Sequence, residues 1–238
     1  MNDPSFVGLR VAITGGTSGL GLALVRALLA RSARVAFVAR DPSRVESIGR
    51  ENPHAHGIVG DVSLKDDIYP IAMQFSGALG GIDVLVNNAS SLGSVPLRLL
   101  ADTDCETLEQ VFATNVLGPF RLTKALLGSL AASAREGRGA VVVNISSDAA
   151  INPYPRWGAY GTTKAALHHM TQIWQQESAD HGIAFLSFDP GDMDTPLHAA
   201  AVPDADPATL KSPETAANEL LDLIAASLAE QKAAESVQ

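Results

Sequence analysis

The stretch LRVAITGGTSGLGLAL, residues 9–24, joins an apolar segment to a glycine-rich turn and then to a run with helical spacing. Residues 9–16 predict a strand that enters the turn, and Leu20, Leu24 and Leu28 recur at the period of a helix. Glycines let such a turn approach a pyrophosphate, whose charge then lies at the helix N-terminus. The alternative is a strand-to-helix turn that binds nothing, because glycine patterns of this kind also occur without a ligand. The turn's glycines stand at positions 15, 16, 19 and 21.

Short apolar and β-branched segments recur along the chain, each followed by a stretch with helical spacing. Such nearly continuous hydrophobic strands are typical of a parallel sheet that is covered on both faces. Strands that alternate with helices predict right-handed βαβ units and an α/β, doubly wound, mostly parallel sheet with helices on both faces. Besides residues 9–16, the predicted strands fall within residues 33–40, 55–62, 82–89, 139–147 and 183–191.

The segment 103–134 reads as one long helix, and Thr103 with Glu106 matches a capping box at its start. No internal repeat, low-complexity segment or linker divides the chain, so we expect one domain over residues 1–238.

Composition narrows the class of protein. The 238 residues carry 17 basic and 26 acidic side chains, a net charge of −9, which argues against nucleic acid and anionic membranes as partners. Cys105 is the only cysteine, so no intramolecular disulfide can form, and a reducing compartment is the simpler interpretation. The first residues lack the pattern of a signal peptide, and no apolar run reaches the roughly 18 residues of a membrane span. We expect a soluble cytoplasmic protein.

The spacing T-G-x-x-x-G-x-G in the glycine turn resembles that of the short-chain dehydrogenase/reductase family. Further motifs resemble the same family in the same order and cover nearly the whole chain. They are Asp61 in GDV, NNAS at 87–90, Asn115 in NVLGPF, Tyr160 and Lys164 in Y-x-x-x-K, and DPGDMDT at 189–195. The resemblance implies a Rossmann-like fold and a nicotinamide nucleotide, and it disfavours the empty-turn alternative.

The resemblance also implies which residues hold the nucleotide. Asp61 and Val62 would contact the adenine, and Thr195 with the backbone around Met193 would close over the nicotinamide carboxamide. Tyr160 and Lys164 belong to the cofactor site as well as to the catalytic set. The remaining predicted cofactor residues are Gly15, Thr17, Ser18, Gly19, Leu20, Gly21, Arg40, Asn88, Ala89, Pro190 and Gly191.

The end of the second predicted strand bears on the choice of nucleotide. A nucleotide without a 2′-phosphate is usually held there by a carboxylate, but this chain has Ala39 followed by Arg40. An arginine can bind a 2′-phosphate through charge-assisted hydrogen bonds, and Arg44 could help. Asp41 reads as a residue that caps the following turn, and the plainer alternative for Arg40 is a solvated surface charge. We predict NADP(H) rather than NAD(H).

The catalytic chemistry requires a proton donor for the alkoxide. A tyrosine with a pKa of about 10 is a poor acid–base group at neutral pH, but a nearby ammonium can lower that pKa. Tyr160 and Lys164 share a helix face. The resemblance implies that Tyr160 donates the proton, that Lys164 binds the ribose hydroxyls and tunes the phenol, and that Asn115 holds a relay water. Ser147 stands at the family's usual distance before the tyrosine and would orient the carbonyl.

Neighbouring polar residues have plainer interpretations. Ser146 is assigned to the strand end, and Tyr154 to a pocket wall or packed loop, because Gly158 stands where a supporting lysine would be needed. His198 could touch substrate or be a solvated loop residue, and both remain open. His168 and His169 read as core or interface groups, Cys105 as inert, and no metal site is expected.

The segment 192–213 corresponds to the family's substrate-binding loop or lid. It has several apolar side chains, such as Met193 and Leu197, and no lysine or arginine before Lys211. Ile151, Pro153, Tyr154 and Trp157 would face it. We therefore expect a small-molecule substrate, namely a hydrophobic ketone or secondary alcohol. The alternatives are an isomerase or lyase that uses bound nucleotide transiently, and a nucleotide-binding protein without turnover.

Two features depart from the family pattern. Ser90 stands where the family has glycine beside the cofactor. The tail 218–238 has helical spacing throughout and lacks the usual final strand, so we expect the seventh strand to be missing. That leaves the surface built by the helices that carry Asn115 and Tyr160, and we predict a homodimer.

Overall fold

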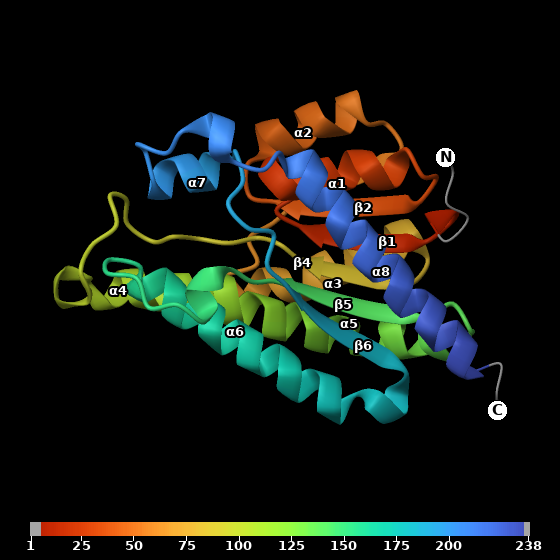
Figure 1. Cartoon of the computed structure of the whole chain (residues 1–238). Helices are drawn as coiled ribbons and strands as arrows, with labels where there is room; N and C mark the ends of the chain where they lie inside the picture. The colour runs from red at the N-terminus through yellow and green to blue at the C-terminus, as the bar shows by residue number, and fades with distance from the viewer. Residues whose placement is uncertain (1–5, 236–238) are drawn as a thin grey trace.

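A computed structural model describes residues 6–235 of the chain. Its centre is a six-stranded parallel sheet in the order β3-β2-β1-β4-β5-β6 (Figure 1). This order reverses between β1 and β4, as in the doubly wound nucleotide-binding folds, and the predicted fold class is confirmed. Each predicted strand segment contains one observed strand: β1 (Arg10–Thr14), β2 (Arg34–Ala39), β3 (Ala55–Val59), β4 (Val84–Asn87), β5 (Ala140–Ile145) and β6 (Ile183–Phe188).

Helices cover both faces of the sheet (Figure 1). Leu24 of α1 and Leu220 of α8 belong to the core on one face, whereas Phe75 of α3 and Leu126 of α5 belong to the core on the other. The sheet is therefore buried on both faces, which explains its continuous apolar strands. The α-helices are α1 (Gly19–Leu29), α2 (Pro42–Glu51), α3 (Lys65–Leu79), α4 (Cys105–Phe112), α5 (Gly118–Arg135), α6 (Gly158–Glu177), α7 (Pro196–Ala201) and α8 (Pro213–Glu235).

The long helix expected over residues 103–134 is interrupted. A π-helical segment, Ala113–Leu117, separates α4 from α5. The capping box is wrong, because α4 begins at Cys105 with Asp104 at its N-cap. A short 3-10 turn just before it takes up Thr103, whose hydroxyl donates to the carbonyl oxygen of Leu99.

The C-terminal region confirms the predicted loss of a seventh strand, since residues 213–235 form the single helix α8 and β6 is the last strand in the described part of the chain. The free edge of β6 is closed in part by α6, where Gln175 Oε1 accepts the Phe185 amide at 2.7 Å. Gln231 of α8 bonds both backbone groups of Ala140 at the start of β5, at 2.9 and 3.1 Å. Gln175 thus satisfies one backbone amide of the edge strand, and Gln231 secures the start of its neighbour.

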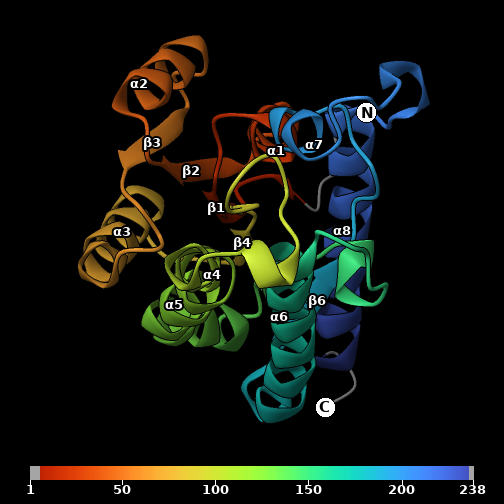
Figure 2. The ribbon, with the colours of Figure 1, turned by 90° about the vertical axis from the view of Figure 1, so that its left-hand side faces the viewer.

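Figure 2 looks at the left-hand side of Figure 1 and shows α7 on the side of α1, with α4 and α6 on the other. Within residues 6–235, no helix is both long and apolar enough to cross a membrane.

Candidate active site

A cavity of about 690 Å³ opens at the carboxyl ends of the strands. Residues directly after β1, β2, β5 and β6 line it, namely Gly15, Arg40, Ser146 and Asp189. Ligands of open α/β sheets bind at this edge, where the strand order reverses, and the volume lies in the range of small-molecule sites. All the predicted cofactor residues line this cavity except Gly21.

The glycine turn is built for close packing between β1 and α1. Gly15 has a φ of 73°, and its amide donates to the Val38 carbonyl oxygen at 2.8 Å. A Cβ on Gly21 would collide with the Gly15 carbonyl oxygen, so Gly21 lets α1 approach the turn from behind the cavity wall. Asn88 holds the same turn, because its Nδ2 donates to the Thr14 carbonyl oxygen at 2.8 Å.

The N-terminus of α1 suits the pyrophosphate of a dinucleotide. Ser18 is the N-cap, but its side chain makes no capping hydrogen bond. The first-turn amides of Gly19 and Leu20 are thus left uncapped beside the cavity that both residues line. Gly19 has a φ of 49°, and a Cβ there would stand 3.1 Å from Thr195 Cγ2, so glycine keeps this passage open. The residues present therefore fit the phosphates of the expected nucleotide.

At the end of β2, Arg40 and Arg44 line the cavity. The Arg40 side chain is 69% exposed, and its guanidinium lies 3.9 Å from Asp61 Oδ2. Asp41 is the N-cap of α2 and accepts the amides of Ser43 and Arg44, as its expected capping role requires. Its hydrogen-bonding capacity is thereby partly used within the helix, whereas Arg40 is available to a ligand.

Tyr160 and Lys164 lie one turn apart on α6, and both line the cavity. The Lys164 Nζ donates to the Ile145 carbonyl oxygen at 2.7 Å and stands 5.4 Å from the centroid of the Tyr160 ring. Burial lowers the pKa of Lys164 to about 8, against an opposing effect of Asp189.

Burial also raises the pKa of Tyr160 to about 12. Hydrogen bonding from Ser147 lowers this pKa, the charge of Asp189 raises it, and hydrogen bonding from Ser90 lowers it. In this structure burial outweighs the hydrogen bonding from the two serines, because the phenol is enclosed and 7% of the residue is exposed, and the lowered pKa that we expected beside Lys164 is not observed.

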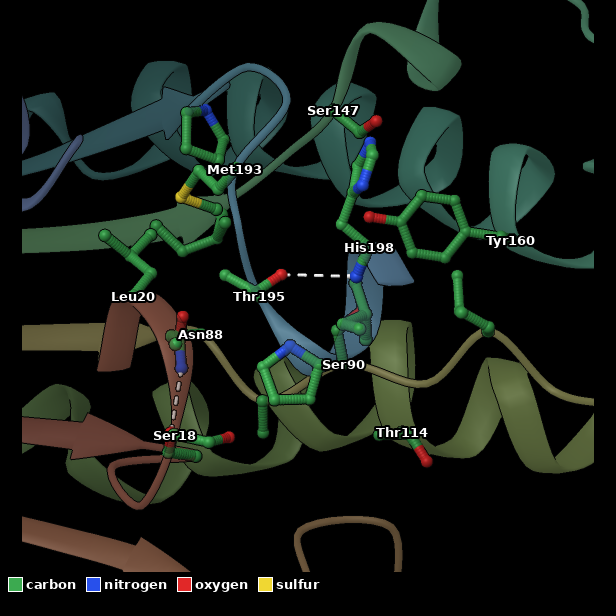
Figure 3. Close-up of a pocket in the computed structure, with 18 of the residues that line it drawn as sticks. Ser18, Leu20, Asn88, Ser90, Thr114, Ser147, Tyr160, Met193, Thr195 and His198 are labelled. Atoms are coloured by element: carbon green, nitrogen blue, oxygen red, sulfur yellow. Dashed lines mark hydrogen bonds between the residues drawn. The ribbon is translucent and has the colours of Figure 1, made fainter. Parts of the chain in front are cut away.

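Ser147 follows β5 and starts a short 3-10 turn, Asp148–Ala150. Its hydroxyl donates to Asp148 Oδ1 at 3.1 Å and accepts the Ala149 amide at 3.2 Å. Figure 3 shows Ser147 and the Tyr160 hydroxyl in the same pocket, beside Thr195 and His198 of the lid segment. The neighbouring Ser146 is buried, and its amide donates to the Phe188 carbonyl oxygen at 2.7 Å.

Asn115 is buried within the π-helical segment and does not line the cavity. Its Oδ1 accepts the Ser91 amide at 2.8 Å and the Ser90 hydroxyl at 3.3 Å. Its Nδ2 donates to the Ser91 carbonyl oxygen and to Thr163 Oγ1, each at 2.9 Å. The Asn115 side chain thus joins the segment after β4 to α6. The π-helical turn that carries it is of a kind that is frequent at functional sites.

His198 lies in the cavity wall. Its Nε2 is 3.6 Å from Asp192 Oδ1, and its buried Nδ1 has no hydrogen-bond partner among the described residues. The solvated-loop interpretation therefore does not describe this side chain, which is 12% exposed. The structure also brings the carboxylates of Asp148 and Asp189 to the cavity, which the sequence reasoning did not consider although both flank recognised motifs.

Aromatic rings line the approach to the phenol. Tyr154 packs edge-on against Trp157 with ring centroids 6.4 Å apart, and Trp157 packs edge-on against Tyr160 at 5.7 Å. The Tyr154 hydroxyl donates to Asp148 Oδ2 at 2.7 Å. His168 hydrogen-bonds Ser187 on β6, which agrees with a structural role. Within residues 6–235, no group of three His, Cys, Asp or Glu side chains could hold a metal ion.

Comparison with known proteins identifies the class of this fold and site. Residues 10–206 match the family model described as short chain dehydrogenase. The chain is 34% identical over 194 residues to 2-(R)-hydroxypropyl-CoM dehydrogenase of Xanthobacter autotrophicus, covering 79% of this chain and 76% of that protein. It is 30% identical over 202 residues to L-fucose dehydrogenase of Bos taurus, covering 84% and 72%.

Solved structures of similar fold indicate the same class of protein. A 3-ketoacyl-(acyl-carrier-protein) reductase from Brucella melitensis, complexed with NADH, matches with a TM-score of 0.84 and 25% identity over 92% of this chain and 91% of that one. A short chain dehydrogenase from Shigella flexneri, complexed with NADP, shares the fold with a TM-score of 0.81 at 23% identity, covering 89% of each chain. The chain belongs to the short-chain dehydrogenase/reductase family, as the motifs predicted. It is an oxidoreductase of a family that binds nicotinamide nucleotides and acts on small molecules.

Proposed function

We propose that this protein is an NADP(H)-dependent carbonyl reductase or secondary-alcohol dehydrogenase. The observation that carries the proposal is the convergence of Ser147, Tyr160 and Lys164 on one cavity that also reaches the glycine turn. A bound nicotinamide would supply the hydride to the carbonyl carbon or take it from the alcohol. The chain's own task is then to bind both molecules, orient the carbonyl oxygen and supply or remove one proton.

Each residue of the predicted catalytic set has a role in this proposal. The Tyr160 phenol, which is protonated at neutral pH, gives its proton to the developing alkoxide. Ser147 orients the carbonyl, and a substrate oxygen would compete with Asp148 for its hydroxyl proton. Lys164 holds the ribose hydroxyls, and Asn115 supports the relay of protons from it.

The preference for NADP(H) is supported by Arg40, which is exposed at the cavity wall where a discriminating carboxylate would otherwise stand. The structural relatives contain NADH in one case and NADP in another, so the preference rests on this chain's residues.

The substrate class follows from the other end of the cavity. Apolar side chains of Leu92, Trp157 and Leu197 line it, together with Asp148, Asp189 and Asp192. Apart from Lys164, the lysine and arginine residues of the described lining are Arg40 and Arg44, both near the end of β2. Carboxylates repel an anionic substrate, so we propose an uncharged, hydrophobic ketone or secondary alcohol.

The two ends of the proposed lid, residues 192–213, are hydrogen-bonded to each other. Met193 and Lys211 form an isolated parallel bridge. The Lys211 amide donates to the Asp192 carbonyl oxygen at 2.9 Å, and the Asp194 amide donates to the Lys211 carbonyl oxygen at 3.0 Å. This pairing gives α7 a fixed attachment over the cavity, which suits a substrate-covering segment.

The proposal includes a homodimer built on α5 and α6. Leu117 precedes α5 directly, Phe120 lies on α5 and Ile173 lies on α6, and these apolar side chains are exposed by 36–45%. It also includes a cytoplasmic location, which suits a chain whose only cysteine is the free Cys105.

The test is a panel of ketones and secondary alcohols, followed by NADPH absorbance and by product analysis. Stoichiometric NADPH oxidation with an uncharged ketone is the expected result. Substrate conversion without net change in nucleotide would favour the isomerase or lyase alternative. Activity confined to phosphorylated or other anionic substrates would contradict the proposed substrate class.

A further inference from the structure

Ser90 places a second hydroxyl at the catalytic phenol, at a position where the family pattern has glycine. It stands three residues after the end of β4 and lines the cavity together with Ser147 and Tyr160. In Figure 3 the Tyr160 hydroxyl lies between the labelled Ser147 and Ser90. Hydrogen bonding from each serine favours a lower pKa of the phenol, although burial raises that pKa to about 12 overall.

The segment that carries Ser90 is held in place by Asn115. The Asn115 amide bonds both backbone groups of Ser91, at 2.8 and 2.9 Å. Its remaining Nδ2 proton goes to Thr163 Oγ1 at 2.9 Å, and that hydroxyl donates to the Tyr160 carbonyl oxygen at 2.7 Å. One buried side chain therefore fixes Ser90 relative to the turn of α6 that carries the phenol.

The Ser90 hydroxyl can change its acceptor at little cost. In this structure it donates to Asn115 Oδ1 at 3.3 Å, a long hydrogen bond. That oxygen also accepts the Ser91 amide at 2.8 Å, so it keeps a partner when Ser90 turns away. Ser147 is less available to the phenol, because its hydroxyl serves Asp148 here and the carbonyl of the substrate in the proposed reaction.

We propose that Ser90 is a further catalytic residue, whose hydroxyl donates a hydrogen bond to the Tyr160 oxygen when that oxygen is a phenolate. In ketone reduction the Tyr160 O–H bond breaks, its proton forms the new O–H bond of the alcohol, and the phenolate remains. Ser90 keeps its own proton throughout and turns from Asn115 to the phenolate. In alcohol oxidation the same hydrogen bond stabilises the base before it takes the substrate's proton. The inference rests on the proposed function.

The first test is the pH profile of kcat/KM for alcohol oxidation, whose acid limb reports the formation of the phenolate. Ser90→Ala and Ser90→Gly should move the midpoint of that limb upward by about one pH unit, the effect of losing a hydrogen bond to a charged group. Ser90→Thr, which keeps a hydroxyl, should stay near the wild-type midpoint. Ser94→Ala is the matched control, because that hydroxyl in the same loop pairs with Thr107 instead. A midpoint that is unchanged in Ser90→Ala would overturn the proposal, even if kcat fell.

A second readout does not depend on turnover. The chain has three tyrosines, so NMR of protein labelled at the tyrosine Cζ carbon gives few signals, and Tyr160→Phe assigns the relevant one. In the protein without nucleotide, Ser90→Ala should raise the pH at which the Tyr160 signal titrates to the phenolate, whereas Ser94→Ala should not. If no alcohol is oxidised, the proposed function fails and this titration alone decides: an unchanged Tyr160 midpoint in Ser90→Ala would overturn the role of Ser90.

Discussion

Burial shifts the pKa values of Tyr160 and Lys164 in opposite directions. Burial raises the pKa of the phenol to about 12 and lowers that of the ammonium to about 8. A phenol with this pKa stays protonated at neutral pH and can serve as the donor for reduction, whereas oxidation requires it to ionise first. Positive charge or hydrogen-bond donors near the phenol favour that ionisation, which is why neighbouring hydroxyls matter at this site.

Arg40 is the residue on which the proposed preference for NADP(H) rests. Arg40→Ala should raise the KM for NADPH by about tenfold or more, because a charge-assisted hydrogen bond to the 2′-phosphate is lost. The KM for NADH should change little. Steady-state kinetics with both nucleotides measures this, with the exposed Arg50→Ala as the control. A wild-type preference for NADH, or an equal loss for both nucleotides, would refute the assignment.

Among the elements, the strands were predictable because each has a continuous apolar run that a doubly covered parallel sheet requires. The break in the long helix was not predictable, because the π-helical segment around Asn115 depends on contacts with Ser91 and Thr163, which are distant in sequence. Thr103 failed as a cap for a local reason: the 3-10 turn before it occupies its hydroxyl. The site motifs could be located from sequence, whereas the carboxylates of Asp148 and Asp189 near the phenol became visible only through folding.

A buried ion pair ties together the amino ends of the strands. Asp83, just before β4, has no exposed side-chain surface and bonds Arg10 of β1 at 2.6 Å and Arg138 at 2.9 Å. Burial alone would raise the pKa of Asp83, but hydrogen bonds from Arg138 and Arg10 outweigh it, and the pKa lies below the ordinary 3.8. The ionised Asp83 carboxylate therefore stabilises the folded state at pH values above its ordinary pKa of 3.8.

Asp83→Asn should lower the free energy of unfolding at neutral pH by about 3 kcal/mol, because two arginines lose a buried partner. Since the folded-state pKa is depressed, the wild-type advantage is present above about pH 4 and is lost as the pH falls through the folded pKa. Urea unfolding at neutral and successively acid pH measures this, with the exposed Asp180→Asn as the control. A difference that stayed constant into strong acid would contradict the ionic account.

At the scale of the whole molecule, β6 is an edge strand, because no seventh strand follows it in residues 6–235, and this limits the surfaces available for assembly. Gln175 occupies one backbone amide at the edge of β6. The apolar surface at α5 and α6 remains exposed, and the Phe120 ring packs at a tilt against Trp174 with ring centroids 6.1 Å apart. In the proposed dimer, the apolar surface of α5 and α6 is buried between the two chains, and the edge of β6 is not.

Light scattering after size exclusion should therefore give the mass of a dimer. Ile173→Glu, which puts a charge on the exposed face of α6, should give a monomer, because an unpaired charge cannot be buried cheaply. Met73→Glu, on the exposed side of α3, should leave the dimer intact and serves as the control. A tetramer in the wild type would show that the surface at α5 and α6 is not the only one used.

The central claim is that Tyr160 supplies the proton for hydride transfer, and Tyr160→Phe tests it most directly. The substitution removes one hydroxyl and keeps the ring that packs against Trp157. NADPH-dependent ketone reduction and NADPH affinity should be measured on the same wild-type and variant preparations. The account predicts that kcat falls by about two to four orders of magnitude while the Kd for NADPH stays within about twofold, since RT ln 2 is below 1 kcal/mol. A variant that binds NADPH normally and still reduces ketones near the wild-type rate would contradict it.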